Sequence, residues 1–151
     1  MIKIITVGSI KEQYLKDAIE EYKKRLSKYT NIEIIEVKDE GLVEVKKALL
    51  LEEEKILKHI NDKDYIITLE IEGEEPTSLE FAEKLDKIRL ETSNIVFIIG
   101  GSYGLSDNIK NKSRWHLSFS KLTFPHQLFR VILLEQIYRA FKINNNESYH
   151  K

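Results

Sequence analysis

Short runs rich in β-branched residues alternate with longer amphipathic stretches along the whole chain, and this alternation limits the possible folds more than any other feature. The runs that predict strands are Ile2–Val7, Ile32–Val37, Tyr65–Ile71 and Ile95–Ile99, with a shorter run near His116–Phe119. Apolar residues recur at helical spacing in the stretches between them. Strands that alternate with helices form a parallel or mostly parallel sheet with helices on both faces. The sequence therefore predicts a single α/β domain over residues 1–151.

The composition excludes several classes of protein. The chain has 151 residues, 42% of them apolar, which is enough for one substantial core. It has no cysteine, so we expect neither disulfides nor thiolate metal sites, and its four histidines lack the spacing of a metal site. The first residues are not a basic leader, and every apolar run is far shorter than the roughly 20 residues that span a bilayer. We therefore expect a soluble, cytoplasmic protein with no metal and no membrane partner.

Charge is distributed unevenly along the chain. Residues 109–151 carry eight Lys or Arg against two Glu, a net charge of +6, whereas residues 1–108 carry −7. A polyanion such as RNA would therefore meet the carboxyl-terminal third of the chain. A chance imbalance is the alternative explanation, since the net charge of the whole chain is only −1.

The last expected helix, from Pro125 to about Ile143, is apolar around most of its circumference. A helix of this kind is buried on more than one side. We favour a partner subunit as the second side, which predicts a homodimer. A helix sandwiched inside the monomer would explain the same pattern.

The first candidate for a ligand site is the glycine-rich segment that directly follows the most apolar strand, Ile95–Ile99. Gly100, Gly101 and Gly104 would let the backbone approach a ligand at the carboxyl end of that strand. The pattern lacks the spacing of a Rossmann fingerprint and the lysine of a phosphate-binding loop. A tight turn between strand and helix explains these glycines equally well.

Two further segments carry groups suited to chemistry. The stretch from Ser118 to Gln127 combines hydroxyls, aromatic rings, a lysine and a histidine, and could hold a planar base; a helix cap followed by proline is the alternative. The chain ends in Tyr149, His150 and Lys151, which could stack on a base, move a proton and pair with a phosphate. Frayed ends are common, so a disordered tail is the alternative here.

Five segments occur in an order that closely resembles one family. They are Leu69-Glu70, Ile99-Gly100-Gly101-Ser102-Tyr103-Gly104, the stretch from Ser118 to Gln127, Glu135-Gln136-Ile137-Tyr138-Arg139-Ala140, and Tyr149-His150-Lys151. With them the chain resembles the ribosomal RNA large subunit methyltransferase H family, the pseudouridine N3-methyltransferases of the SPOUT class. The resemblance covers the whole chain, and its most specific parts are Thr-Phe-Pro-His-Gln and the Tyr-Arg-Ala helix.

The resemblance implies a SPOUT-type sheet with a carboxyl-terminal trefoil knot at approximately residues 95–151. General rules of chain connection would not predict the knot, because knots are rare. It also implies a homodimer that uses S-adenosylmethionine to methylate N3 of a pseudouridine in 23S ribosomal RNA, with the large subunit or whole ribosome as partner. Besides the three glycines, the positions expected to bind the cofactor are Leu69, Phe119, Ser120, Lys121, Leu122, Thr123 and Phe124.

The same resemblance suggests how the transfer would be arranged. The tail of one subunit would lie over the cofactor of the other, with His150 as proton acceptor or orienting group and Tyr149 positioning the base. Arg130, Arg139 and Lys151 are candidates for phosphate contacts. Arg139 could instead satisfy a carboxylate on the dimer interface.

Two other functions are compatible with an α/β domain. A non-catalytic RNA-binding dimer would have a damaged cofactor loop, and the sequence shows none. A flavodoxin-like mononucleotide binder would need a phosphate-binding loop after the first strand, where Gly8-Ser9-Ile10-Lys11 offers too few suitable groups.

Overall fold

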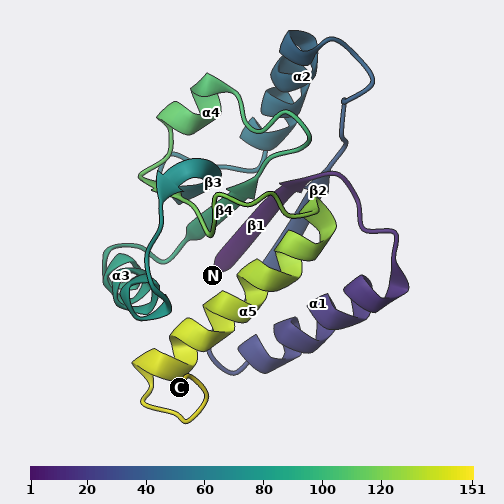
Figure 1. Cartoon of the computed structure of the whole chain (residues 1–151). Helices are drawn as coiled ribbons and strands as arrows, with labels where there is room; N and C mark the ends of the chain where they lie inside the picture. The colour runs from purple at the N-terminus through teal and green to yellow at the C-terminus, as the bar shows by residue number, and fades with distance from the viewer.

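Five strands and five helices alternate along the chain in the computed structural model, which describes residues 1–151 (Figure 1). In chain order they are β1 (Ile2–Val7), α1 (Gln13–Leu26), β2 (Ile32–Val37), α2 (Val45–Leu57), β3 (Tyr65–Glu74), α3 (Ser78–Glu91), β4 (Ile95–Ile99), α4 (Asp107–Asn111), β5 (Trp115–Leu117) and α5 (His126–Asn144).

The strands form one sheet in the order β2-β1-β4-β3-β5, and every neighbouring pair is parallel. All five residues of β4 are buried, because this strand lies in the middle of the sheet with both faces covered. The expected parallel α/β sheet of the SPOUT type is therefore confirmed. The trefoil knot stays a prediction.

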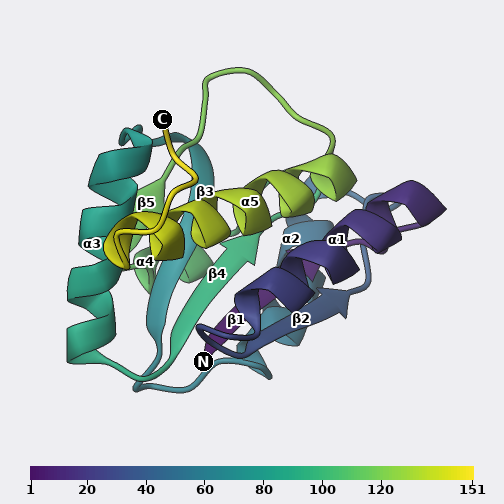
Figure 2. The same cartoon turned by 90° about the horizontal axis from the view of Figure 1, so that it is seen from below.

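Helices cover both faces of the sheet. Helices α1, α3 and α5 lie on one face, and α2 and α4 lie on the other (Figure 2). The side chains of β4 alternate between the two resulting cores: Phe97 packs into the larger core under α1, α3 and α5, whereas Val96 and Ile98 pack into the smaller one. Because all strands are parallel, their carboxyl ends meet at one edge, where the loops that follow them converge.

Two elements differ in extent from the expectation. Strand β3 continues to Glu74, beyond the expected end at Ile71, because its last residue pairs with Leu117 of β5 after an irregularity in the register. The helical spacing of apolar residues between β2 and β3 starts at Leu42, but helix α2 begins only at Val45. Leu42 is fully exposed, so it does not belong to the apolar face of the helix.

Helix α5 lies on the sheet between α1 and α3, which explains most of its apolar circumference (Figure 2). Leu133, Leu134 and Ile137 are completely buried within the chain. The monomer thus covers most of the apolar circumference, so this pattern alone does not require a partner subunit. Although α5 is the longest helix, no helix of the chain has the length and apolarity needed to cross a membrane.

Candidate functional site

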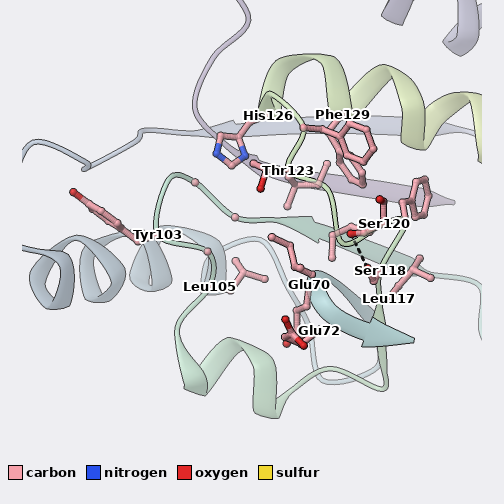
Figure 3. A pocket seen from close by; sticks show the side chains of 18 of the residues that line it. Glu70, Glu72, Tyr103, Leu105, Leu117, Ser118, Ser120, Thr123, His126 and Phe129 are labelled. Carbon is pink, nitrogen blue, oxygen red and sulfur yellow. Dashed lines mark hydrogen bonds between the residues drawn. The ribbon is translucent and has the colours of Figure 1, made fainter. Parts of the chain in front are cut away.

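A pocket of about 540 Å³ lies at the carboxyl ends of β3, β4 and β5 (Figure 3). Ligands of open parallel sheets bind at this edge, and the volume is within the range of roughly 300–1,000 Å³ typical of small-molecule sites. The pocket brings together nine of the ten expected cofactor residues: Leu69, Gly100, Gly101, Gly104, Phe119, Ser120, Leu122, Thr123 and Phe124. Residues separated by more than 50 positions in the sequence thus form one site.

The glycine segment after β4 folds into a tight turn that forms one wall of the pocket. The backbone N–H of Gly104 donates to the carbonyl of Gly101 at 3.0 Å, and Gly104 has a φ of +75°, which favours glycine. A Cβ on Gly100 would lie 2.5 Å from the carbonyl oxygen of Gly104, too close for any side chain. Both interpretations of these glycines therefore apply, since the tight turn itself exposes backbone to the pocket.

Aromatic rings form the opposite side of the pocket. The rings of Phe124 and Phe129 are stacked with their centroids 5.9 Å apart, and Phe119 packs against Phe129 at 5.1 Å. The segment that carries Phe119 and Phe124 is held by its own hydroxyls: Ser118 Oγ donates to the carbonyl of Ser120 at 3.1 Å, and the Leu122 N–H donates to Ser120 Oγ at 2.9 Å. These rings offer flat apolar faces to a planar ligand group.

Lys121 does not line the pocket, which corrects the expectation for this residue. Its side chain is 66% exposed and lies 3.8 Å from Glu75, outside the pocket. Lys121 lies at the tip of the bend that the hydrogen bond from the Leu122 N–H to Ser120 Oγ closes, which explains why its side chain leaves the pocket wall.

Two carboxylates in the pocket wall were not expected. Glu70 and Glu72 line the pocket opposite His126 and Phe129 in the view of Figure 3. The Thr68 hydroxyl donates to Glu70 at 2.6 Å, and His116 Nδ1 forms a second hydrogen bond with the same carboxylate. The sequence signal was a charge at the end of a strand that is otherwise apolar. These carboxylates make the pocket suitable for a cationic ligand.

A buried carboxylate of α2 supports the glycine turn from behind. Glu52 is 3% exposed and accepts the backbone N–H of Glu40 at 2.9 Å. A Cβ on Gly101 would lie 3.6 Å from its Oε1, so the carboxylate lies directly under the turn. Burial raises the pKa of Glu52 above its ordinary value, and the negative charge of Asp39 adds to this effect, although the Glu40 N–H opposes it.

We expect Glu52→Gln to stabilise the chain at about pH 8 and to have no effect near pH 4. The folded pKa of Glu52 lies above the unfolded one, so the folded state binds more protons between the two values and loses stability as the pH rises. Glutamine removes this cost and keeps an oxygen for the Glu40 N–H. Urea unfolding at both pH values measures the difference, with Glu54→Gln on the exposed face of α2 as the control. A stability difference that is equal at both pH values would contradict the assignment.

The carboxyl-terminal tail is ordered and folds back onto α5. Asn146 has a φ of +54°, which reverses the chain after the helix. Glu147 accepts a hydrogen bond from the Tyr29 hydroxyl at 2.6 Å and pairs with Lys142 at 3.1 Å, and these contacts hold the pKa of Glu147 at about 2. The Tyr149 hydroxyl then donates to Glu135 at 2.8 Å. The alternative of a frayed tail is therefore wrong.

Neither Tyr149 nor His150 lines the pocket of its own chain. The ring of Tyr149 packs edge-on against Tyr138, at 5.0 Å between centroids, and Tyr138 lies nine residues beyond the pocket residue Phe129. At 1.5 Å per residue this is about 14 Å along the helix axis. The single chain thus does not bring the expected tail residues and the expected cofactor residues together.

The phosphate contact expected for Arg130 stays a prediction, and its side chain is only 1% exposed. Its guanidinium pairs with Glu36 at 2.6 Å and donates to the carbonyl of Gly8 at 2.8 Å. The sequence could not reveal this, since Glu36 is 94 residues away from Arg130. Through these bonds, the buried Arg130 links α5 to the ends of β1 and β2.

Arg139 and Lys151 differ in their surroundings. Arg139 pairs with Glu135 at 2.8 Å, one helical turn away in the same chain and not across a dimer interface, and its Nη1 lies 3.1 Å from Nδ1 of His150. Its side chain is still 25% exposed, so one face of the guanidinium remains open. Lys151 is fully available at the surface.

Known proteins resemble the chain over its whole length. The family model described as "Predicted SPOUT methyltransferase" matches residues 1–150. A relative from Methanococcus maripaludis is 56% identical over an alignment of 157 positions that covers 99% of each chain. The ribosomal RNA large subunit methyltransferase H of Caldicellulosiruptor saccharolyticus is 53% identical over 154 residues that cover 100% of both chains.

A solved structure agrees in fold. The ribosomal RNA small subunit methyltransferase E from Neisseria gonorrhoeae, bound to S-adenosyl methionine, superposes with a TM-score of 0.52 at 14% identity. The match covers 90% of this chain and 64% of that one. At this identity it supports the fold alone. The family model and the full-length relatives decide the identity, and they show that the chain belongs to the SPOUT methyltransferases.

Proposed function

We propose that the chain transfers a methyl group from S-adenosylmethionine to N3 of a pseudouridine in 23S ribosomal RNA. The observation that carries this proposal is the pocket, which gathers nine of the ten expected cofactor positions at the carboxyl edge of the sheet. The Caldicellulosiruptor relative is a ribosomal RNA large subunit methyltransferase H, which supports the large-subunit RNA as substrate.

The residues of the pocket fit this cofactor. The stacked rings of Phe124 and Phe129 suit the adenine, and the backbone of the Gly100–Gly104 turn lines the pocket, where no Cβ of Gly100, Gly101 or Gly104 stands in the way. Glu70 would favour a ligand that carries positive charge. When bound, S-adenosylmethionine supplies an electrophilic methyl group on its sulfonium. The protein then has to hold the nucleophile in line with that group in a dry site.

The tail residues would position the acceptor base. Burial and the hydrogen bond to Glu135 raise the pKa of Tyr149 to about 12, so this hydroxyl stays protonated and acts as a donor. Arg139 donates to Nδ1 of His150, which leaves Nε2–H as the group that faces outward. This contact favours an orienting role for His150 over that of proton acceptor.

The separation of tail and pocket supports a homodimer in which each pocket receives the partner's tail. Leu122, which lines the pocket, is 72% exposed, and Leu128 in the first turn of α5 is 40% exposed. A second chain placed here would cover these side chains and exclude water from the site. We place the reaction in the cytoplasm, on the assembled ribosome, which would add binding surface that a small dimer lacks.

Methyl transfer from labelled S-adenosylmethionine to 70S ribosomes that lack this modification tests the proposal. We expect label at one pseudouridine of 23S ribosomal RNA, with the methyl group on N3. Label at another nucleotide would show that the chain is a methyltransferase with a different RNA substrate. Binding of S-adenosylmethionine without any transfer to ribosomes would contradict the proposed function and favour an RNA-binding protein that keeps the fold.

A further inference from the structure

A second cleft, of about 590 Å³, lies at the carboxyl ends of β1 and β2 beside the first turn of α5. Figure 1 shows that α5 begins next to the tips of these two strands. Only two of its eleven lining residues are apolar, so the cleft suits a charged group better than a base. His126 lines both this cleft and the pocket, which makes them neighbours.

The charged side chains of the cleft have a small positive excess. Lys11, Lys38 and Arg130 line it, against the carboxylates of Glu36 and Asp39. Both carboxylates are already engaged: Glu36 by Arg130 and the Ile10 N–H, and Asp39 by the Gly41 N–H at 2.7 Å. Lys55, Lys121 and Lys142 each pair with a glutamate, whereas Lys11 and Lys38 pair with none. Two free ammonium groups therefore border the cleft.

The first turn of α5 adds unsatisfied donors to the same place. The helix has 19 residues, and no side chain caps its amino terminus. Its first backbone hydrogen bond is donated by Phe129 to Pro125, so the amides before Phe129 have no partner within the helix. His126 and Gln127 of this turn line the cleft. Amides at a helix amino terminus favour an anion, most often a phosphate.

Arg130 provides an independent sign that the cleft suits an anion. Its side chain is 1% exposed and forms part of the cleft wall, yet its Nε–H has no hydrogen-bond partner. Burial lowers its pKa in spite of the ion pair with Glu36, so the present contacts do not fully compensate the buried charge. A negative group in the cleft would supply the missing stabilisation.

We propose that this cleft binds a phosphate of the RNA strand that carries the acceptor nucleotide. The inference rests on the proposed function, because RNA is the substrate there. The phosphate is held by Lys11, Lys38 and the first amides of α5. The buried positive charge of Arg130 in the cleft wall stabilises it further. Because His126 separates the cleft from the pocket by a single side chain, a strand fixed here would present a nearby base to the cofactor.

The double variant Lys11→Gln and Lys38→Gln tests the site, with Lys46→Gln and Lys47→Gln on exposed positions of α2 as the matched control. We expect KM for 70S ribosomes to rise about tenfold or more, while kcat and the Kd for S-adenosylmethionine stay unchanged. The slope of log affinity against log salt, measured by anisotropy of the labelled protein on ribosomes, should fall by about 1 per lysine removed. The control variant should keep the slope of the unmodified chain.

Two outcomes separate this site from the proposed function. If the unmodified chain methylates ribosomes and the double variant keeps both KM and salt slope, the phosphate site is wrong. If the unmodified chain transfers no methyl group, the proposed function fails first, and inorganic phosphate followed by NMR still tests the cleft. Phosphate should then shift the amides of Gln127 and Leu128 in the unmodified chain and not in the double variant; unshifted amides would refute the site.

Discussion

Replacing Gly100 with alanine is expected to abolish binding of S-adenosylmethionine while the chain stays folded. The new Cβ would lie 2.5 Å from the carbonyl oxygen of Gly104 and 3.0 Å from its Cα. Both are backbone atoms, so the Gly100–Gly104 turn has to open and the pocket wall changes shape. We expect the Kd to rise at least about 100-fold, equivalent to about 2.8 kcal/mol of binding free energy. Isothermal titration calorimetry measures it, and circular dichroism checks the fold.

Gly104→Ala is the matched control for this variant. A Cβ at Gly104 would meet no atom within 4 Å, so only the positive φ of +75° opposes it. That strain costs roughly 1–3 kcal/mol, and it weakens the turn without blocking the pocket. We therefore expect a clearly smaller loss of binding than for Gly100→Ala. Equal affinity of the Gly100→Ala variant and the unmodified chain would show that the cofactor does not bind against this turn.

His150→Ala is expected to lower kcat for methyl transfer by about 100-fold or more, with an unchanged Kd for S-adenosylmethionine. His150 does not line the pocket of its own chain, so its loss should leave cofactor binding intact. Its contact with Arg139 would present Nε2–H to the acceptor base from the partner's tail. Single-turnover transfer to ribosomes measures the chemical step, and His59→Ala, whose side chain lies outside both cavities, is the control.

Tyr149→Phe completes the test of the tail. This variant keeps the packing against Tyr138 and loses the hydrogen bond to Glu135. If the tail positions the base, kcat should fall while the melting temperature changes little. Full activity of both tail variants would contradict the assigned role of the tail.

Local sequence patterns predicted the sheet and most of the pocket. The apolar run Ile95–Ile99 and the glycines after it indicated a central strand with a ligand site at its end, and the structure has both. The strand order β2-β1-β4-β3-β5 could not be derived in the same way, because it depends on how helices of similar amphipathic pattern pack. The resemblance to a known family supplied the residues of the segment between β5 and α5.

Long-range pairing explains the errors at single residues. The burial of Arg130 could not be predicted because its partner Glu36 lies on another strand, and a sequence does not show which carboxylate reaches a buried arginine. Glu70 was not expected in the pocket, because the sequence does not show whether a carboxylate next to Leu69 faces the pocket or the solvent. Lys121 was included with its neighbours because the sequence does not show the bend between Ser120 and Leu122 that places it outside the pocket.

We propose that one active site combines the pocket of one chain with the tail of another. Mixed dimers of the Gly100→Ala and His150→Ala variants, formed by unfolding and refolding the two together, test this claim most directly. Each mixed dimer would contain one intact pocket facing one intact tail, and half of the dimers would be mixed. We therefore predict about a quarter of the unmodified methyl-transfer activity from two variants that are each inactive alone. A mixture as inactive as its two components would contradict the shared site.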